Sequence, residues 1–211
     1  LLSSIGIAPT QEPLTATLPD SSRNDLPEEL REATVLNASR ESNKEMGYAV
    51  IHPGTARPEK YWRSDRWAEV IKHVSSQGLT PVITGAAGEE EVAHVSQIKA
   101  ALDGNVPVID LVGKLSFLES AQVISQCRIF LGVDTAAMHL ASAFQRSLVA
   151  LFGPTSAFRW RPRNPEARVI LSGQDAPVTR FQMNDEAGDM SAISSRSVLD
   201  AIDALLTEQN P

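Results

Sequence analysis

From Tyr48 onward, short apolar runs alternate with segments whose apolar residues recur at helical spacing. Apolar runs of this length, bounded by Gly, Pro and polar residues, are typical of buried strands. Their alternation with amphipathic helices is typical of a parallel sheet. Strands are therefore expected at residues 48–52, 81–84, 108–112, 129–133, 148–152 and 168–171.

Helices are expected between most of these strands and after the last one. Ser64 is a predicted N-cap, because apolar residues recur at helical spacing after it. Ser116 begins a capping-box pattern with Glu119. The apolar residues after Ser64 run to Val74, and further helices are expected at about residues 89–102, 116–127, 135–144 and 194–206. The pattern predicts an α/β fold, a Rossmann-like open parallel sheet with helices on both faces.

Residues 9–46 have a different texture, with four prolines and few long apolar runs. This composition favours a connector that carries a short strand near Leu14–Leu18 and a helical turn near Pro27–Arg31. Residues 47–211 then form the domain. Nothing in the connector indicates catalysis.

Composition excludes several classes of protein. The net charge of −7 disfavours a nucleic-acid binder, and no apolar run approaches the length of a membrane span or of a signal peptide core.

The lone Cys127 lies in an apolar stretch and is expected to pack as a small hydrophobe. The basic segment 159–163 is expected to be a solvated loop with one packed Trp, the alternative being a contact with an anionic acceptor or membrane headgroups.

Candidate chemistry gathers where the predicted strands end. Asp134, Thr135 and His139 follow one strand, and Thr155 follows the next. Ligands of open parallel sheets bind outside the carboxyl ends of the strands, so these side chains are expected to face one crevice. The small residues after Thr135 leave helix N–H groups free for a pyrophosphate. Asp134 as a simple N-cap and His139 as a packing residue remain the alternatives.

Two further loops belong to the same predicted edge. After the first strand, Gly54, Thr55 and Lys60 suit phosphate, although a solvated basic loop has the same composition. After the second strand, three consecutive glutamates begin with Glu89. One of them accepts hydrogen bonds from a ribose, or all three simply favour the helix N-terminus.

The sequence lacks the motifs of several enzyme classes. The sequence has no P-loop, no Gly-x-Gly-x-x-Gly fingerprint and no Gly-x-Ser-x-Gly elbow. It also lacks metal-ligand spacing of His or Cys, and an Asp-x-Asp pair that would hold a divalent ion on a diphosphate. No cofactor is expected.

Three motifs together resemble the carboxyl-terminal half of glycosyltransferase family nine, the ADP-heptose:lipopolysaccharide heptosyltransferases. They are His52-Pro53-Gly54 with Lys60-x-Trp62, Gly132-Val133-Asp134-Thr135 with Met138-His139-Leu140-Ala141, and Leu151-Phe152-Gly153-Pro154-Thr155. Their order and separations also agree, and the resemblance covers about residues 48–206.

The resemblance implies the GT-B fold, in which two Rossmann-like domains face each other and the carboxyl-terminal one holds the donor. Thr55 and Lys60 would contact the diphosphate, and Glu89 or its neighbour Glu90 the adenosine ribose. Leu115 would lie against adenine. The residues expected at the phosphates and the heptose are Asp134, Thr135, Ala136 and His139. Ala136 stands where the family usually has Gly, and its methyl group would crowd a phosphate.

The implied reaction is an inverting, metal-independent transfer of heptose from ADP-heptose to the lipid A and inner-core oligosaccharide acceptor. The family's general base lies in the amino-terminal domain, so residues 1–46 are expected to be the end of that domain and the connector. The chain alone is then expected to be inactive. The parent enzyme would be cytoplasmic and peripheral at the inner membrane. A non-catalytic nucleotide-binding module and another GT-B enzyme that uses a UDP-sugar remain alternatives.

Overall fold

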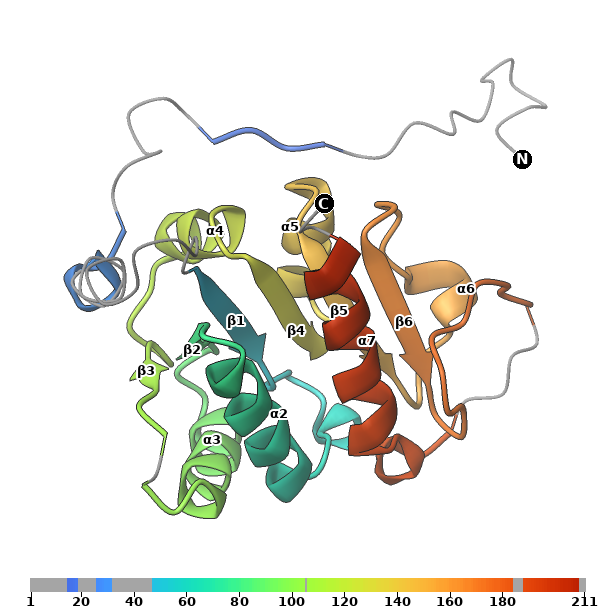
Figure 1. Cartoon of the computed structure of the whole chain (residues 1–211), viewed down its shortest axis with the longest axis horizontal. Helices are drawn as coiled ribbons and strands as arrows, with labels where there is room; N and C mark the ends of the chain where they lie inside the picture. The colour runs from blue at the N-terminus through green and yellow to red at the C-terminus, as the bar shows by residue number, and fades with distance from the viewer. Residues whose placement is uncertain (1–14, 19–25, 32–46, 105, 184–187, 209–211) are drawn as a thin grey trace.

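The computed structural model describes residues 15–18, 26–31, 47–104, 106–183 and 188–208. Its centre is a six-stranded, all-parallel sheet with strand order β3-β2-β1-β4-β5-β6 (Figure 1). The strands are β1 (Tyr48–His52), β2 (Thr80–Ile83), β3 (Ile109–Asp110), β4 (Ile129–Val133), β5 (Ser147–Phe152) and β6 (Ala167–Leu171). The predicted α/β class is confirmed.

Helices cover both faces of the sheet. In Figure 1, α2 (Ser64–Ser76), α3 (Glu89–Ala101) and α7 (Ser195–Glu208) lie in front, and α4 (Phe117–Ser125) and α5 (Ala136–Ala143) lie behind. Short helical segments are η3 (Pro58–Lys60), α6 (Ala157–Trp160) and η4 (Met190–Ala192). None of the described helices is long and apolar enough to cross a membrane.

Alternate residues of each central strand enter two separate hydrophobic cores. Ile51 and Leu131 pack in the core beneath α2, α3 and α7, whereas Val50 and Phe130 pack in the core beneath α4 and α5. Because successive side chains of a strand point to opposite faces, a continuous apolar run fills both cores. This is why the buried strands show no polar alternation in the sequence.

Helix starts agree with the prediction in two places and differ in one. The Ser116 and Glu119 capping box is present, with both reciprocal hydrogen bonds, and Ser194 Oγ accepts from Ser197 N. Ser64 is not an N-cap. It is the first residue of α2, and its hydroxyl donates to Gln97 Oε1 instead.

The third strand is much shorter than the predicted 108–112 run. Only Ile109 and Asp110 pair with β2. Leu111 N still donates to Ile83 O at 2.9 Å. A turn at residues 112–114 then ends the strand, with Lys114 N donating to Leu111 O at 3.2 Å.

The structure agrees with the predicted connector in one segment and differs in another. Residues 28–31 are helical as expected, and Leu30 is fully buried in the core beneath α4 and α5. Residues 15–18 form no strand, and Ala16 N donates to Ala143 O. Leu14 and residues 1–7, the expected end of a preceding domain, lie outside the described residues.

The basic segment 159–163 contradicts the expected packed Trp. Trp160 is 56% exposed. The neighbouring Arg161 guanidinium lies 4.4 Å from the centre of the Phe181 ring, a contact that suits a planar guanidinium. Cys127 is buried as predicted, and burial raises the pKa of its thiol to about 12.

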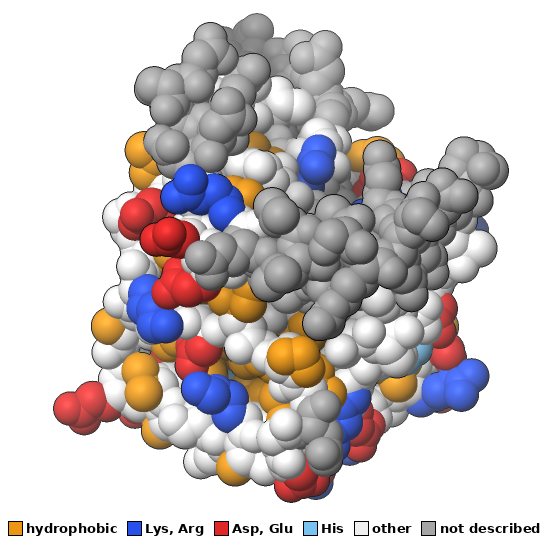
Figure 2. Space-filling view, turned by 60° about the vertical axis from the view of Figure 1, so that its left-hand side comes forward, with side chains coloured by type: hydrophobic (Ala, Val, Ile, Leu, Met, Phe, Trp, Pro, Cys, Tyr) orange, Lys and Arg blue, Asp and Glu red, His pale blue; other side chains and the backbone are white. Residues whose placement is uncertain are grey.

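Figure 2 shows the side of the molecule that lies to the left in Figure 1. Among the described residues on this face, Lys and Arg side chains lie between Asp and Glu side chains.

Candidate functional site

The loops after β1, β2 and β4 lie side by side at the carboxyl edge of the sheet. The register pairs Ile51 with Ile83 on one side of β1 and His52 with Gly132 on the other. The loop after β1 is therefore flanked by the loops that follow β2 and β4. These three loops carry most of the side chains that the sequence predicted for the site.

A buried ion pair joins two of these loops. Lys60 Nζ donates to Asp134 Oδ2 at 2.9 Å and also to the Asp134 carbonyl oxygen at 2.9 Å. The two side chains are only 11% and 9% exposed. The pair spans 74 residues of sequence and ties the segment around η3 to the start of α5.

Thr135, rather than Asp134, caps α5. Its Oγ1 accepts from Met138 N at 3.5 Å, and its backbone is extended. This leaves the Asp134 carboxylate free to pair with Lys60. The alternative in which Asp134 is a simple N-cap is therefore wrong.

His139 and Ala136 lie at the same corner. His139 Nε2 is 4.0 Å from Asp134 Oδ1, and its side chain is 45% exposed. Ala136 is exposed at the first position of α5. The structure thus brings together Lys60, Asp134, Thr135, Ala136 and His139, and it leaves His139 accessible to a ligand.

The other predicted positions lie after β1, β2 and β3. Thr55 is 7% exposed, and its Oγ1 accepts from Arg57 N at 3.3 Å. Glu89 is exposed in the first turn of α3. Leu115 is partly buried against the core beneath α4 and α5, in the loop between β3 and α4.

Glu91 is a residue that the sequence reasoning did not single out. It is 9% exposed, and its Oε2 accepts from Ala86 N at 2.9 Å. It is the third residue of α3, the position from which a capping-box glutamate reaches back to the preceding loop. That spacing is the signal that distinguishes Glu91 from its two exposed neighbours.

His52 and Thr84 lie at the carboxyl ends of β1 and β2 and contact each other. His52 Nδ1 and Thr84 Oγ1 are 3.0 Å apart, and burial lowers the pKa of His52 to about 4. The imidazole is therefore neutral at neutral pH. On the far side, Thr155 Oγ1 and Ser156 Oγ are buried with no hydrogen-bond partner among the described residues.

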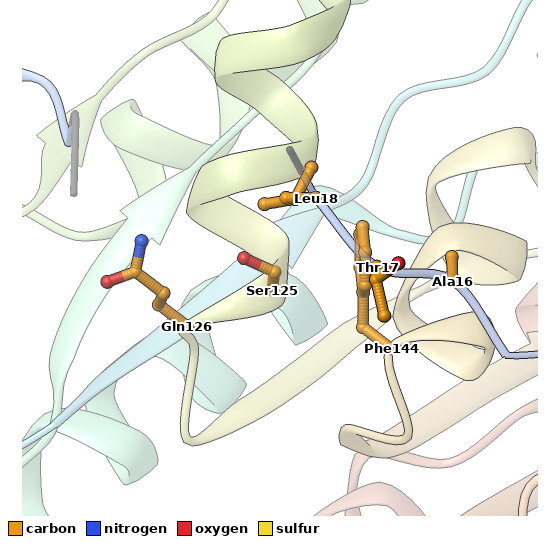
Figure 3. Close-up of a pocket in the computed structure, with 6 residues that line it drawn as sticks. All are labelled: Ala16, Thr17, Leu18, Ser125, Gln126 and Phe144. Carbon is orange, nitrogen blue, oxygen red and sulfur yellow. The ribbon is translucent and has the colours of Figure 1, made fainter. Parts of the chain in front are cut away.

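Two hollows lie away from this edge. One of about 340 Å³ lies at the opposite edge of the sheet, where residues 16–18 cross the ends of α4 and α5 (Figure 3). Its other labelled residues are Ser125, Gln126 and Phe144. None of the described residues that line it is charged, and none is a predicted site residue. The second, of about 320 Å³, lies beside β6.

Comparisons with known proteins agree on one family. Residues 13–190 match the family model for glycosyltransferase family 9 (heptosyltransferase). Lipopolysaccharide heptosyltransferase 3 of Escherichia coli is 31% identical over 160 residues, which are 75% of this chain and 47% of that protein. The chain spans about half the length of the curated relatives it matches.

Solved structures agree on the fold. E. coli ADP-heptose lps heptosyltransferase II superposes with a TM-score of 0.68 at 23% identity, over 93% of this chain and 54% of that one. The glycosyl transferase family 9 protein from Veillonella parvula gives 0.63 at 22% identity, over 87% and 53%. With the family model matched over most of its length, this chain belongs to glycosyltransferase family 9, the heptosyltransferase family.

Proposed function

We propose that this chain is the donor-binding half of an inverting, metal-independent glycosyltransferase that transfers heptose from ADP-heptose to the inner core of lipopolysaccharide. The observation that carries the proposal is that three strand-end loops lie side by side at one edge of the sheet, two of them joined by the buried Lys60–Asp134 pair. In open parallel sheets this edge is where nucleotides bind.

Each part of ADP-heptose has a counterpart at the edge. Lys60 and Thr55 would face the diphosphate, because an ammonium and a hydroxyl are donors to phosphate oxygens. The exposed Glu89 carboxylate would accept from the ribose hydroxyls, and Leu115 would pack against adenine. Asp134, Thr135, Ala136 and His139 would line the phosphates and the sugar, with the N-terminus of α5 favouring negative charge.

The transfer itself needs a general base that removes the acceptor hydroxyl proton as that oxygen attacks the anomeric carbon and ADP leaves. We place this base in an amino-terminal domain that faces the site, as the family resemblance implies. The 211-residue chain would then bind donor without catalysing transfer. Transfer of heptose by the purified chain at a rate typical of the family would contradict this part of the proposal.

The acceptor in the proposed reaction is the lipid A and inner-core oligosaccharide. A lipid acceptor would place the parent enzyme at the cytoplasmic face of the inner membrane, as a peripheral protein. Metal independence is a further part of the proposal, tested by adding a chelator to the binding and transfer assays.

Calorimetric titration tests the donor site. ADP and ADP-heptose should bind, and UDP-sugars should bind much more weakly. Glu89→Gln should weaken ADP binding, whereas Glu69→Gln, which changes an exposed glutamate on α2, should leave it unchanged. Preference for UDP would indicate another GT-B enzyme. Binding of ADP by a full-length protein that transfers no sugar would indicate a non-catalytic module.

A further inference from the structure

The buried Glu91 carboxylate lies between two of the loops at the carboxyl edge. On one side its Oε2 accepts from Ala86 N at 2.9 Å, in the loop after β2. This is a charge-assisted hydrogen bond to a backbone group, a strong class of contact. The loop it holds leads directly into the α3 turn that presents Glu89.

On the other side the carboxylate touches the loop after β1. A Cβ added to Gly54 would lie 2.3 Å from Glu91 Oε2 and 2.8 Å from its Cδ, so only a glycine leaves room for this carboxylate. A Cβ on Gly85 would lie 3.1 Å from the same oxygen. Two glycines, one in each loop, therefore make room for the carboxylate.

An aromatic pair lies beside this carboxylate. Tyr61 and His94 stack with their ring centres 4.5 Å apart and an angle of 2° between their planes. Desolvation, and then the charge of Glu91, raise the pKa of Tyr61. Burying a carboxylate is costly unless it is fixed by donors, so its position between the loops needs an explanation beyond helix capping.

We infer that Glu91 is a positioning residue that sets the spacing between the loop presenting Thr55 and the loop leading to Glu89. The inference rests on the proposed function, because these loops would meet two different parts of the ADP moiety, the diphosphate and the ribose. A fixed spacing lets one ligand engage both loops without ordering them at the moment of binding. Loss of that preorganisation weakens a ligand that spans both loops.

The first experiment compares ADP with its parts. Glu91→Ala should weaken ADP binding about tenfold, the effect of losing one charge-assisted hydrogen bond. Adenosine and pyrophosphate, each of which meets one loop, should compete with a fluorescent ADP analogue within about twofold of their wild-type affinities. Glu91→Gln keeps an acceptor for Ala86 N and should restore most of the ADP affinity. Glu69→Ala is the matched control.

Two results would overturn the inference. One is a Glu91→Ala protein that binds ADP as the wild type does. The other is an equal loss for ADP, adenosine and pyrophosphate, because general disruption of the domain, unlike lost spacing, affects every ligand alike.

A double-mutant cycle gives a second test. Gly54→Ala displaces the Glu91 carboxylate, so it should weaken ADP binding in the wild-type background and add little in Glu91→Ala. Additive losses would mean that the two residues act separately. Amide hydrogen exchange of Ala86 needs no nucleotide and should accelerate in both single variants. If wild-type protein bound no ADP, the proposed function would fail, whereas unchanged exchange at Ala86 would defeat the role of Glu91.

Discussion

Replacing Lys60 by Met should destabilise the domain by about 3–5 kcal/mol, because it leaves the Asp134 carboxylate buried and unpaired. The Nζ and Oδ2 atoms are 2.9 Å apart. At an effective dielectric constant of 20 their attraction is about 6 kcal/mol, which the desolvation of two ions largely offsets. The intact pair therefore adds little net stability, and the large cost arises when one partner is removed.

Thermal and urea unfolding, followed by circular dichroism, measure this cost. For a domain of this size the loss corresponds to a fall in Tm of roughly 10 °C. Lys60→Met combined with Asp134→Leu removes both charges and should recover most of the stability. The matched control is Arg196→Met, which breaks the exposed pair with Asp200 in α7 and should change the stability far less, because solvent screens an exposed pair.

The reasoning fails if Lys60→Met is no less stable than Arg196→Met. It also fails if the double variant is as unstable as Lys60→Met, because the cost would then come from lost packing of the lysine side chain. ADP should raise the Tm of the wild type and not that of Lys60→Met, since the ammonium is proposed to contact the diphosphate.

Three other predictions follow from single residues. Because burial holds the pKa of His52 near 4 against about 6.5 unfolded, stability should fall by up to about 3 kcal/mol as pH drops from 6.5 to 4. The fall in urea-unfolding free energy should be shallower in His52→Gln; an identical slope would contradict the assignment. Ala136→Gly should raise ADP affinity several-fold in calorimetry, at a cost of about 0.5–1 kcal/mol of stability. Unchanged affinity would show that the Ala136 methyl group does not crowd a phosphate. Cys127 should react with iodoacetamide only as fast as the domain unfolds, and rapid labelling of native protein at pH 8 would show the thiol is accessible.

The sheet was predictable because its signal is local. In a continuous apolar run such as 148–152, the side chains on both faces of the strand must be buried. The glycines and polar residues after each run mark the end of the strand. The third strand was overestimated because the turn at residues 112–114, in which Lys114 N donates to Leu111 O, leaves no trace in the hydrophobicity of the preceding run. Trp160 was expected to pack and is exposed, whereas the contact of its neighbour Arg161 with Phe181 is not visible in the sequence.

The site was predictable only as a set of loops. Spacing located Asp134 and the three glutamates, but it could not tell which carboxylates turn inward. For Asp134 the answer depends on Lys60, 74 residues earlier in the chain. For Glu91 it depends on the absence of a side chain at Gly54. Both are long-range contacts that local propensity does not encode.

The Lys60–Asp134 pair also bears on how an anion would be received at this edge. An ammonium has three N–H donors, and Asp134 takes two of them, through its carboxylate and its carbonyl oxygen. In the proposed donor complex the third N–H would donate to a phosphate oxygen, so an incoming diphosphate would not need to break the pair. Asp134 then orients the ammonium before the ligand arrives. The same carboxylate that makes burial of Lys60 tolerable thus fixes the direction in which it can donate.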